Sequence, residues 1–260
     1  MRTRSLLAGG ARAELRPEGY LDLLGGDAPE STGTTQDLML SRLVPQVYER
    51  WWRPALGRVA KGALGPGMDD EHRIARLLLG LSPGNVVLDV ACGTGNFSRD
   101  FARTAGERGL VVGIDVSETM LERAVSDTAA AGLERQLAFV RGDAAALPFA
   151  DETFDGVCCF AALHLFADPL RALDRMAAIL KPGGRVAIFT SVRVRSVPLR
   201  VTESVLSRPS GMRMFERDEV TGALRERGFG EVRQRITGVT QFVGGEKSGG
   251  QGADVAAPAP

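Results

Sequence analysis

The chain has 260 residues, with 32 basic and 32 acidic side chains, so its formal net charge is zero. Apolar residues make up 44% and charged residues 25%, a composition typical of an ordinary globular domain. The balanced charge argues against a general nucleic-acid-binding protein, which needs a surplus of basic residues to displace counterions from phosphates. A chain of this length buries enough apolar surface to fold without disulfides or a structural metal.

The three cysteines, Cys92, Cys158 and Cys159, lack the C-x-x-C spacing of metal or redox sites. We therefore expect a reducing, cytoplasmic location and no bound metal. No run of about 18 apolar residues is present, so we expect no membrane span. The stretch "SLLAGGARA" at residues 5–13 has too short an apolar core for a secretory signal.

The two ends of the chain differ from its middle. Residues 1–40 hold clusters of Gly, Pro, Ser and Thr without sustained periodicity, which predicts an irregular N-terminal extension. Residues 244–260 are rich in Gly, Ala and Pro and have little to bury, which predicts a disordered tail. The residues between them, 41–243, are expected to form one domain.

Within this domain, apolar runs alternate with amphipathic segments. Ser117 is expected to cap one helix, and Asp168, followed by Pro169, another. This alternation predicts a parallel sheet with helices on both faces. The predicted elements are, in chain order, a helix at 69–81, a strand at 85–90, a helix at 93–104, a strand at 110–116, the helix after Ser117, strands at 136–143 and 154–162, the helix after Asp168, a strand at 185–190, a helix at 217–229, and strands at 230–238 and 240–244.

The sharpest motif is "VLDVACGTGNF" at residues 87–97, a strand that runs through a glycine turn into a helix. Gly93 and Gly95 allow a tight turn and a close approach of the backbone to a ligand. A dinucleotide fingerprint needs a third glycine where Ser98 stands, which disfavours an NAD-dependent oxidoreductase. The carboxylate of Asp89, beside the turn, suits a ligand ammonium group better than a pyrophosphate.

Two more acids end the next two predicted strands. Asp115 lies about 20 residues past the loop, where an acid accepts hydrogen bonds from both hydroxyls of a ribose. Asp143 lies where a carboxylate and the adjacent backbone can read an adenine edge. Because the carboxyl ends of parallel strands meet in one crevice, Asp89, Asp115 and Asp143 together predict a ligand with an amino group, a ribose and a base but no phosphate.

The chain resembles the class I S-adenosylmethionine-dependent methyltransferases, in particular the type 11 group that includes ubiquinone/menaquinone C-methyltransferase-like enzymes. The resemblance covers roughly residues 45–243, and the stretches that carry it are "VLDVACGTG", "VVGIDVSETML", "RGDAAALPFADETFDGV" and "ALHLFADPLRALDRMAAILKPGGRVAIF". It implies a Rossmann-like, doubly wound α/β fold. The sheet would have seven mostly parallel strands with an antiparallel last strand, helices on both faces and an N-terminal helical lid.

The resemblance also implies a role for each matching position in binding S-adenosylmethionine. The family often has glycine where Ala91 stands, so this chain departs mildly from the pattern. The implied roles are contact with the methionine moiety for Asp89, Ala91, Gly93 and Gly95, with the ribose for Asp115, with the adenine for Val116, Met120, Asp143 and Ala144, and with the surroundings of the sulfonium for Ala161 and His164.

Transfer of a sulfonium methyl group is an in-line displacement that depends mainly on alignment, and a base is needed only when the acceptor must lose a proton. His164 is the candidate base, and the alternative is that it docks its loop through backbone bonds. Tyr48 and Trp52 are candidate lid residues, or they anchor their helix to the core. The arginine-rich link at 191–216 would bind an acidic acceptor or form a solvated face.

We therefore expect methyl transfer to carbon or oxygen of a small-molecule acceptor, such as a quinone, a polyketide or another secondary metabolite. One alternative is an RNA base methyltransferase, which the neutral charge and the scarcity of aromatic residues disfavour. Another is a non-catalytic protein that binds S-adenosylmethionine. Nucleic acid is thus not an expected partner.

Overall fold

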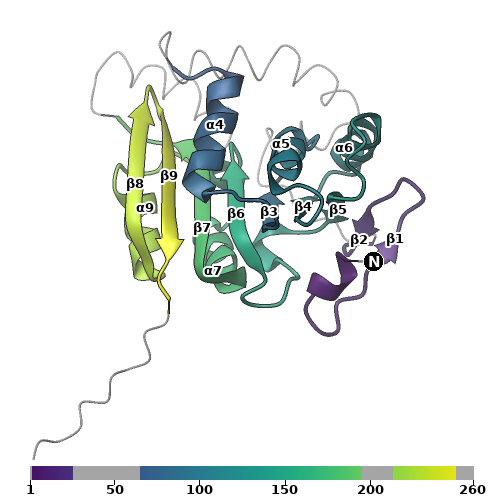
Figure 1. The fold of residues 1–260 in the computed structure, drawn as a ribbon. Coiled ribbons are helices and arrows are strands. Elements are labelled where there is room, and N and C mark those ends of the chain that lie inside the picture. The colour runs from purple at the N-terminus through teal and green to yellow at the C-terminus, as the bar shows by residue number, and fades with distance from the viewer. Residues whose placement is uncertain (1, 26–64, 195–212, 250–260) are drawn as a thin grey trace, which may run out of the picture.

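The computed structural model describes residues 2–25, 65–194 and 213–249 (Figure 1). Tyr48 and Trp52, and with them the predicted lid, lie outside these ranges, as does most of the link at 191–216.

The strands are β1 (Glu14–Leu15), β2 (Leu21–Asp22), β3 (Val86–Val90), β4 (Leu110–Asp115), β5 (Leu137–Arg141), β6 (Phe154–Phe160), β7 (Leu180–Ser191), β8 (Phe229–Thr237) and β9 (Thr240–Lys247). The helices are α4 (Met68–Leu79), α5 (Asn96–Ala105), α6 (Glu118–Ala130), α7 (Pro169–Ile179) and α9 (Glu219–Glu226), with 3-10 turns η1 (Arg4–Leu6), η3 (Ala144–Ala146) and η4 (Leu163–Leu165).

The strands form one sheet in the order β1-β2-β5-β4-β3-β6-β7-β9-β8. Strands β5, β4, β3, β6 and β7 are parallel neighbours, and β9 lies antiparallel to both β7 and β8. The predicted mostly parallel sheet with an antiparallel last strand is therefore confirmed. The strand order reverses at β3, whose neighbours are β4 on one side and β6 on the other, and such a reversal opens a ligand crevice at the carboxyl ends of the strands.

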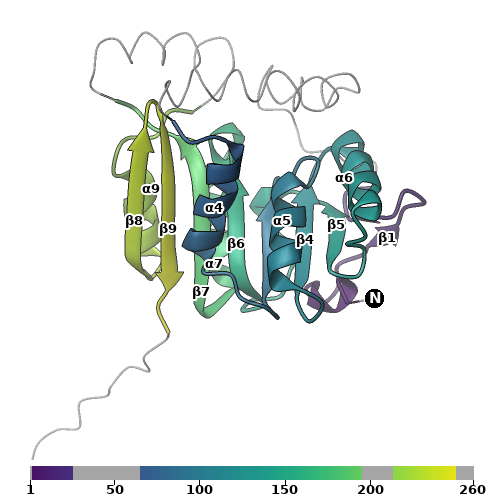
Figure 2. The same ribbon diagram turned by 45° about the horizontal axis from the view of Figure 1, so that its top comes forward.

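Helices cover both faces of the sheet, as Figures 1 and 2 show: α4, α5 and α6 lie on one face, and α7 and α9 on the other. Successive strand residues point to opposite faces, so the apolar runs feed two separate cores. Val87 and Cys158 pack under α4 and α5, whereas Leu88 and Cys159 pack against the α7 and α9 side. The adjacent cysteines are thus both buried packing residues on opposite faces of the sheet.

Both predicted helix caps are present. The Ser117 hydroxyl accepts a hydrogen bond from the Met120 N–H at 3.4 Å and begins α6. The Asp168 carboxylate accepts from the Arg171 N–H at 3.0 Å, and Pro169 occupies the first turn of α7. Each cap satisfies a backbone donor that has no partner within its helix, which fixes where the helix begins.

The prediction that residues 1–40 are irregular is wrong for residues 14–22, which add two strands to the sheet edge (Figure 1). Leu21 and Asp22 of β2 pair in parallel with Val140 and Arg141 of β5, and β1 pairs antiparallel with β2. Strands of two residues are too short to leave a periodic sequence pattern. Their pairing depends on the open edge of β5, which is distant in the sequence.

The predicted tail also begins too early, because β9 continues through Gly244 and Gly245 to Lys247. These glycines pair with Ala187 and Val186 of β7. A Cβ atom at Gly244 would lie 2.8 Å from the Leu78 Cδ2 atom, so the glycine that looked like a linker residue lets α4 pack closely on the sheet. Strand β7 likewise begins at Leu180, directly after α7, so it takes in the "KPGG" stretch that precedes the strand predicted at 185–190.

Replacing Gly113 in the middle of β4 by alanine should destabilise the fold by about 1–3 kcal/mol, because overpacking forces neighbouring atoms to move. The new Cβ atom would lie 2.7 Å from the Phe139 Cδ1 atom and 2.8 Å from the Cys92 Sγ atom. The matched control is Gly222→Ala in α9, where none of the described residues comes within 4 Å of the added Cβ atom and alanine favours the helix. Urea denaturation measures both, and equal stabilities of the two variants would contradict the packing account.

Candidate active site

The turn after β3 has an unusual backbone. Gly93 and Gly95 have φ angles of 55° and 74°, and Ala91 has φ 56°, all in the left-handed region. A Cβ atom at Gly95 would lie 2.9 Å from the Phe139 Cζ atom, so both its conformation and its packing require glycine. Among the described residues, no atom lies within 4 Å of such a Cβ atom at Gly93. In that part of the chain the backbone at Gly93 therefore faces open space at the carboxyl ends of the strands, where a ligand can approach closely.

Asp89, the acid before the turn, is only 3% exposed and lies on the face of the sheet that α5 covers. The Ser98 hydroxyl donates a hydrogen bond to its Oδ2 atom at 2.6 Å. Ser98 is the residue that replaces the third glycine of a dinucleotide fingerprint, and sequence reasoning used it only to exclude that motif. In the structure, it orients the carboxylate beside the turn.

Asp115 links the glycine turn to the end of β4. Its Oδ2 atom accepts from the Gly93 N–H at 2.8 Å, and its Oδ1 atom accepts from the Ser117 N–H at 2.9 Å. Burial raises the pKa of this carboxyl group, and backbone hydrogen bonds from Ser117, Gly93 and Val116 oppose that rise by stabilising the charged form. A carboxylate has about four acceptor positions, so acceptor capacity remains after these backbone bonds and suits a ribose hydroxyl.

The third acid lies at the end of the neighbouring strand. Asp143 caps the turn η3, and its Oδ1 atom accepts from the Ala145 N–H at 2.9 Å. The Gly142 N–H donates to the Asp115 carbonyl at 3.0 Å, which ties the ends of β4 and β5 together. The structure thus brings the three predicted acids to the ends of three adjacent strands. Met120 in the first turn of α6 is buried, and the predicted adenine neighbours Val116 and Ala144 are partly buried.

On the other side of the crevice, Ala161 and His164 follow β6. Ala161 has φ 58°, and its N–H donates to the Phe189 carbonyl at 2.8 Å. The His164 Nδ1 atom lies 3.3 Å from the Thr190 hydroxyl, and the His164 carbonyl accepts from the Arg213 N–H at 2.9 Å. Burial lowers the pKa of His164 to about 4, so the imidazole is neutral at neutral pH. These contacts attach the loop after β6 to β7 and to the end of the arginine-rich link.

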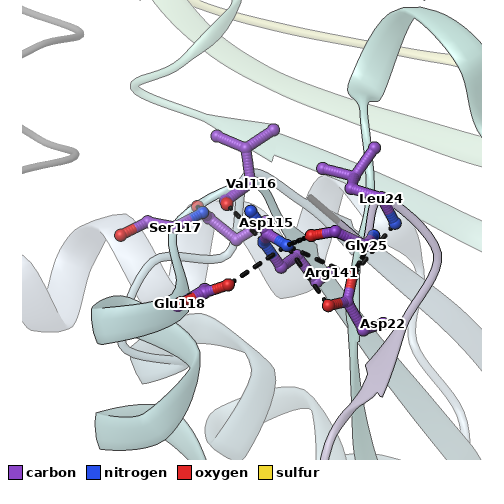
Figure 3. A network of polar contacts seen from close by, with 8 residues as sticks. All are labelled: Asp22, Leu24, Gly25, Asp115, Val116, Ser117, Glu118 and Arg141. Atoms are coloured by element: carbon purple, nitrogen blue, oxygen red, sulfur yellow. Dashed lines mark hydrogen bonds and ion pairs between the residues drawn. The ribbon is translucent and has the colours of Figure 1, made fainter. Parts of the chain in front are cut away.

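Sequence reasoning missed one buried cation next to these acids. Arg141, the last residue of β5, bonds to the N-terminal hairpin through Asp22 and Gly25 and to the β4–α6 turn through Val116 and Glu118 (Figure 3). The only signal was a charged residue at the end of an otherwise apolar strand, which gives no indication of its partner.

His72, in α4, is only partly exposed. Its ring packs edge-on against Phe97 with 4.4 Å between the centroids, because α4 lies across the first turn of α5. In the described ranges, no group of three His, Cys, Asp or Glu side chains has an arrangement that could hold a metal ion. None of the helices in those ranges has both the length and the apolar character that crossing a membrane requires.

Comparison with known families shows what the chain is similar to. Residues 87–184 match the family described as "Methyltransferase domain", and this segment holds the glycine turn and all three acids. The match, the motifs and the sheet topology make the chain similar to the class I S-adenosylmethionine-dependent methyltransferases.

Particular relatives agree with this class. The chain is 35% identical over 172 residues to an uncharacterized chloroplastic methyltransferase of Arabidopsis thaliana, covering 64% of this chain and 47% of that protein. It is 38% identical over 110 residues to the ubiquinone/menaquinone biosynthesis C-methyltransferase UbiE of Marinomonas, covering 42% of this chain and 44% of that one. The chain therefore spans about half the length of the curated relatives it matches.

Among solved structures, the [4+2]-cyclase SpnF has the same fold, with a TM-score of 0.65 and 18% identity over 86% of this chain and 99% of that one. At this identity the similarity concerns the fold alone. A protein named a cyclase on the same fold indicates that function must be argued from the site rather than from the architecture.

The residues present fit S-adenosylmethionine. Open space at Gly93 leaves room for close contact with the methionine moiety, and Asp89 beside it supplies a carboxylate for an amino group. The acceptor capacity left on Asp115 suits a ribose hydroxyl, and Asp143 follows the end of the neighbouring strand β5. All of these groups lie at the carboxyl edge of the parallel strands, where such folds bind ligands.

Ala91 holds a left-handed conformation that glycine adopts without strain. Ala91→Gly should therefore stabilise the fold by about 0.5–1 kcal/mol, the relief of strain being partly offset by the greater freedom of glycine in the unfolded chain. The same change at Ala129, an exposed position in α6, should destabilise by a similar amount. Urea denaturation gives the sign of the change in the free energy of unfolding. A destabilised Ala91→Gly variant would show that the methyl group makes contacts that outweigh the strain.

His164 should make folding sensitive to acid. Its pKa is about 4 in the folded chain and 6.5 in the unfolded one, so the unfolded state binds more protons between these values. The free energy of unfolding should fall by up to about 3 kcal/mol as the pH drops from 6.5 to 4. In His164→Gln this component should be absent, which urea denaturation across that pH range measures. A variant with the wild-type pH dependence would contradict the burial of a neutral imidazole.

Proposed function

We propose that this chain transfers a methyl group from S-adenosylmethionine to a small-molecule acceptor. The observation that carries the proposal is the hydrogen bond between the glycine turn and the next strand. The Gly93 N–H donates to the Asp115 carboxylate at 2.8 Å. This bond joins an open backbone surface to a carboxylate with remaining acceptor positions. The same function is supported by the residue pattern, by the matched domain and by the similarity to named methyltransferases.

The bound cosubstrate supplies an activated methyl group on a sulfonium centre. The residues around Gly93 would hold the methionine moiety through backbone contacts, with Asp89 near its amino group. Asp115 would hold the ribose hydroxyls, while Asp143 and its neighbours at the end of β5 would recognise the adenine. In an in-line displacement, such fixed contacts contribute to the rate by alignment.

His164 and Ala161, on the loop after β6, would border the acceptor side of the site. A neutral imidazole can accept a proton, but proton transfer is most efficient when the pKa of the base lies near the working pH. A pKa of about 4 therefore makes His164 useful as a base only for an acceptor that loses its proton readily. Its contacts with Thr190 and with Arg213 favour a role in docking the loop.

The acceptor we favour is a quinone, a polyketide or another secondary metabolite, methylated at carbon or oxygen. Support comes from the similarity to a C-methyltransferase of ubiquinone and menaquinone biosynthesis, which covers 42% of this chain. The balanced charge of the chain favours a small molecule over RNA. A second candidate is a protein that binds S-adenosylmethionine without transferring its methyl group, which the cyclase of the same fold makes worth testing.

Calorimetric titration with S-adenosylhomocysteine tests the binding half of this proposal. The wild type should bind it and should not bind NADH. Asp115→Asn should weaken binding by about 10- to 100-fold, because each hydrogen bond to a charged group contributes about 1.5–3 kcal/mol. Asp155→Asn is the matched control, because this carboxylate accepts from the Val86 N–H at 2.7 Å at the opposite edge of the sheet.

An absence of binding by the wild type would contradict the proposal. Binding that Asp115→Asn leaves unchanged would contradict the assigned ribose contact. If binding is found, incubation with candidate quinone and polyketide acceptors separates the two candidate functions. An enzyme forms S-adenosylhomocysteine in proportion to the methylated acceptor, and a binder that does not transfer forms none.

A further inference from the structure

The N-terminal hairpin meets the proposed cofactor site at Arg141 (Figure 3). This residue is 6% exposed, and its Nη1 atom donates to the two carboxylate oxygens of Asp22 at 3.2 and 3.3 Å and to the Gly25 carbonyl at 2.7 Å. Its Nε atom donates to the Val116 carbonyl at 3.2 Å, and Glu118 lies 3.1 Å from its Nη1 atom. One buried guanidinium therefore connects the hairpin to the turn that follows Asp115.

Asp22 is oriented independently of the arginine. Its Oδ1 atom accepts from the N–H groups of Leu24 and Gly25 at 2.9 and 3.1 Å, so the turn after β2 fixes the carboxylate. Asp22 is 3% exposed, and a buried charge is tolerated only with a partner. The hairpin thus presents a fixed negative charge to the end of β5.

Arg141 has a second carboxylate within reach, Asp115. The two are register partners on adjacent parallel strands, so their side chains leave the same face of the sheet from backbones about 4.8 Å apart. In the part of the chain that the structure describes, however, Asp115 bonds to backbone N–H groups, and the guanidinium is directed toward Asp22 and Glu118. The arginine beside the proposed ribose acid is therefore held away from it.

The direction of the guanidinium matters for binding. An Arg141–Asp115 ion pair would occupy the acceptor positions that a ribose diol needs, because guanidinium groups favour two-point contact with carboxylates. We propose that Asp22 is a positioning residue for the cofactor site, which holds Arg141 on the hairpin and so keeps Asp115 open to the ribose. This inference rests on the proposed function, and it adds to the site an element that lies outside the matched segment 87–184.

The test titrates S-adenosylhomocysteine and 5′-methylthioadenosine, which has the ribose and the adenine but no amino acid moiety. Asp22→Asn keeps an oxygen for the N–H groups of the turn but loses the charge that holds Arg141. Affinity for both ligands should fall about tenfold, as expected when a hydrogen bond to a charged group is lost. Adding Arg141→Met should restore the affinity to within about threefold of wild type, because no guanidinium then remains to pair with Asp115.

A purely structural ion pair predicts a different pattern. The variants would then lose stability in urea denaturation, and the affinity of the folded fraction would stay at the wild-type value. The control Asp155→Asn removes a carboxylate that lies 2.7 Å from Lys181 at the far edge of the sheet, and it should leave both affinities unchanged. Wild-type affinity in folded Asp22→Asn, or a double variant that binds no better than Asp22→Asn, would overturn the inference and leave the proposed function standing.

Two further outcomes are decisive. If the wild type binds neither ligand, the proposed function fails, and this inference fails with it. If Asp22→Asn does not fold, Glu118→Gln is tested in its place. The Glu118 side chain is 46% exposed, so its replacement does not disturb the packing of the core. It removes the other carboxylate that attracts Arg141, so affinity should fall about threefold, less than for a buried partner. An unchanged affinity in Glu118→Gln would then overturn the inference.

Discussion

The hydrogen bond from the Gly93 N–H to the Asp115 carboxylate is the contact on which the site depends. The turn after β3 is left-handed at Ala91, Gly93 and Gly95, and the strained conformation of Ala91 persists only when its surroundings define it. Asp115 supplies that support from the next strand, and its second oxygen binds the Ser117 N–H where α6 begins. One buried carboxylate therefore fixes the loop that faces open space and the helix start beside it, and it retains acceptor positions for a ligand.

The parallel sheet explains why acids that are distant in the sequence lie together. Because β3, β4 and β5 are adjacent and parallel, the residues that end them share one edge, and the reversal of strand order at β3 separates the helices above that edge. Asp89, Asp115 and Asp143 each also accept a bond from a neighbouring hydroxyl or N–H group, which fixes their directions. The hairpin extends the same edge and contributes Asp22.

The two sides of the crevice differ in character. On the side of the proposed cofactor, carboxylates and backbone N–H groups form specific bonds, and the matched methyltransferase segment covers the same residues. On the side of the proposed acceptor, His164 contacts Thr190 of β7, a strand that also carries the buried Phe189. A cyclase shares this architecture, so the fold alone does not determine which chemistry the crevice supports.

The sequence by itself determined the order of helices and strands in the central domain, the caps at Ser117 and Asp168, and the three acids with their glycine turn. These features are local, since periodicity, capping side chains and turn residues act over a few positions. Only the tertiary structure decided that residues 14–22 form a hairpin, that β9 extends to Lys247, and that Ser98 binds Asp89. It also decided the pair between Arg141 and Asp22, which are 119 positions apart. Such contacts depend on which strands become neighbours, and no local pattern specifies that.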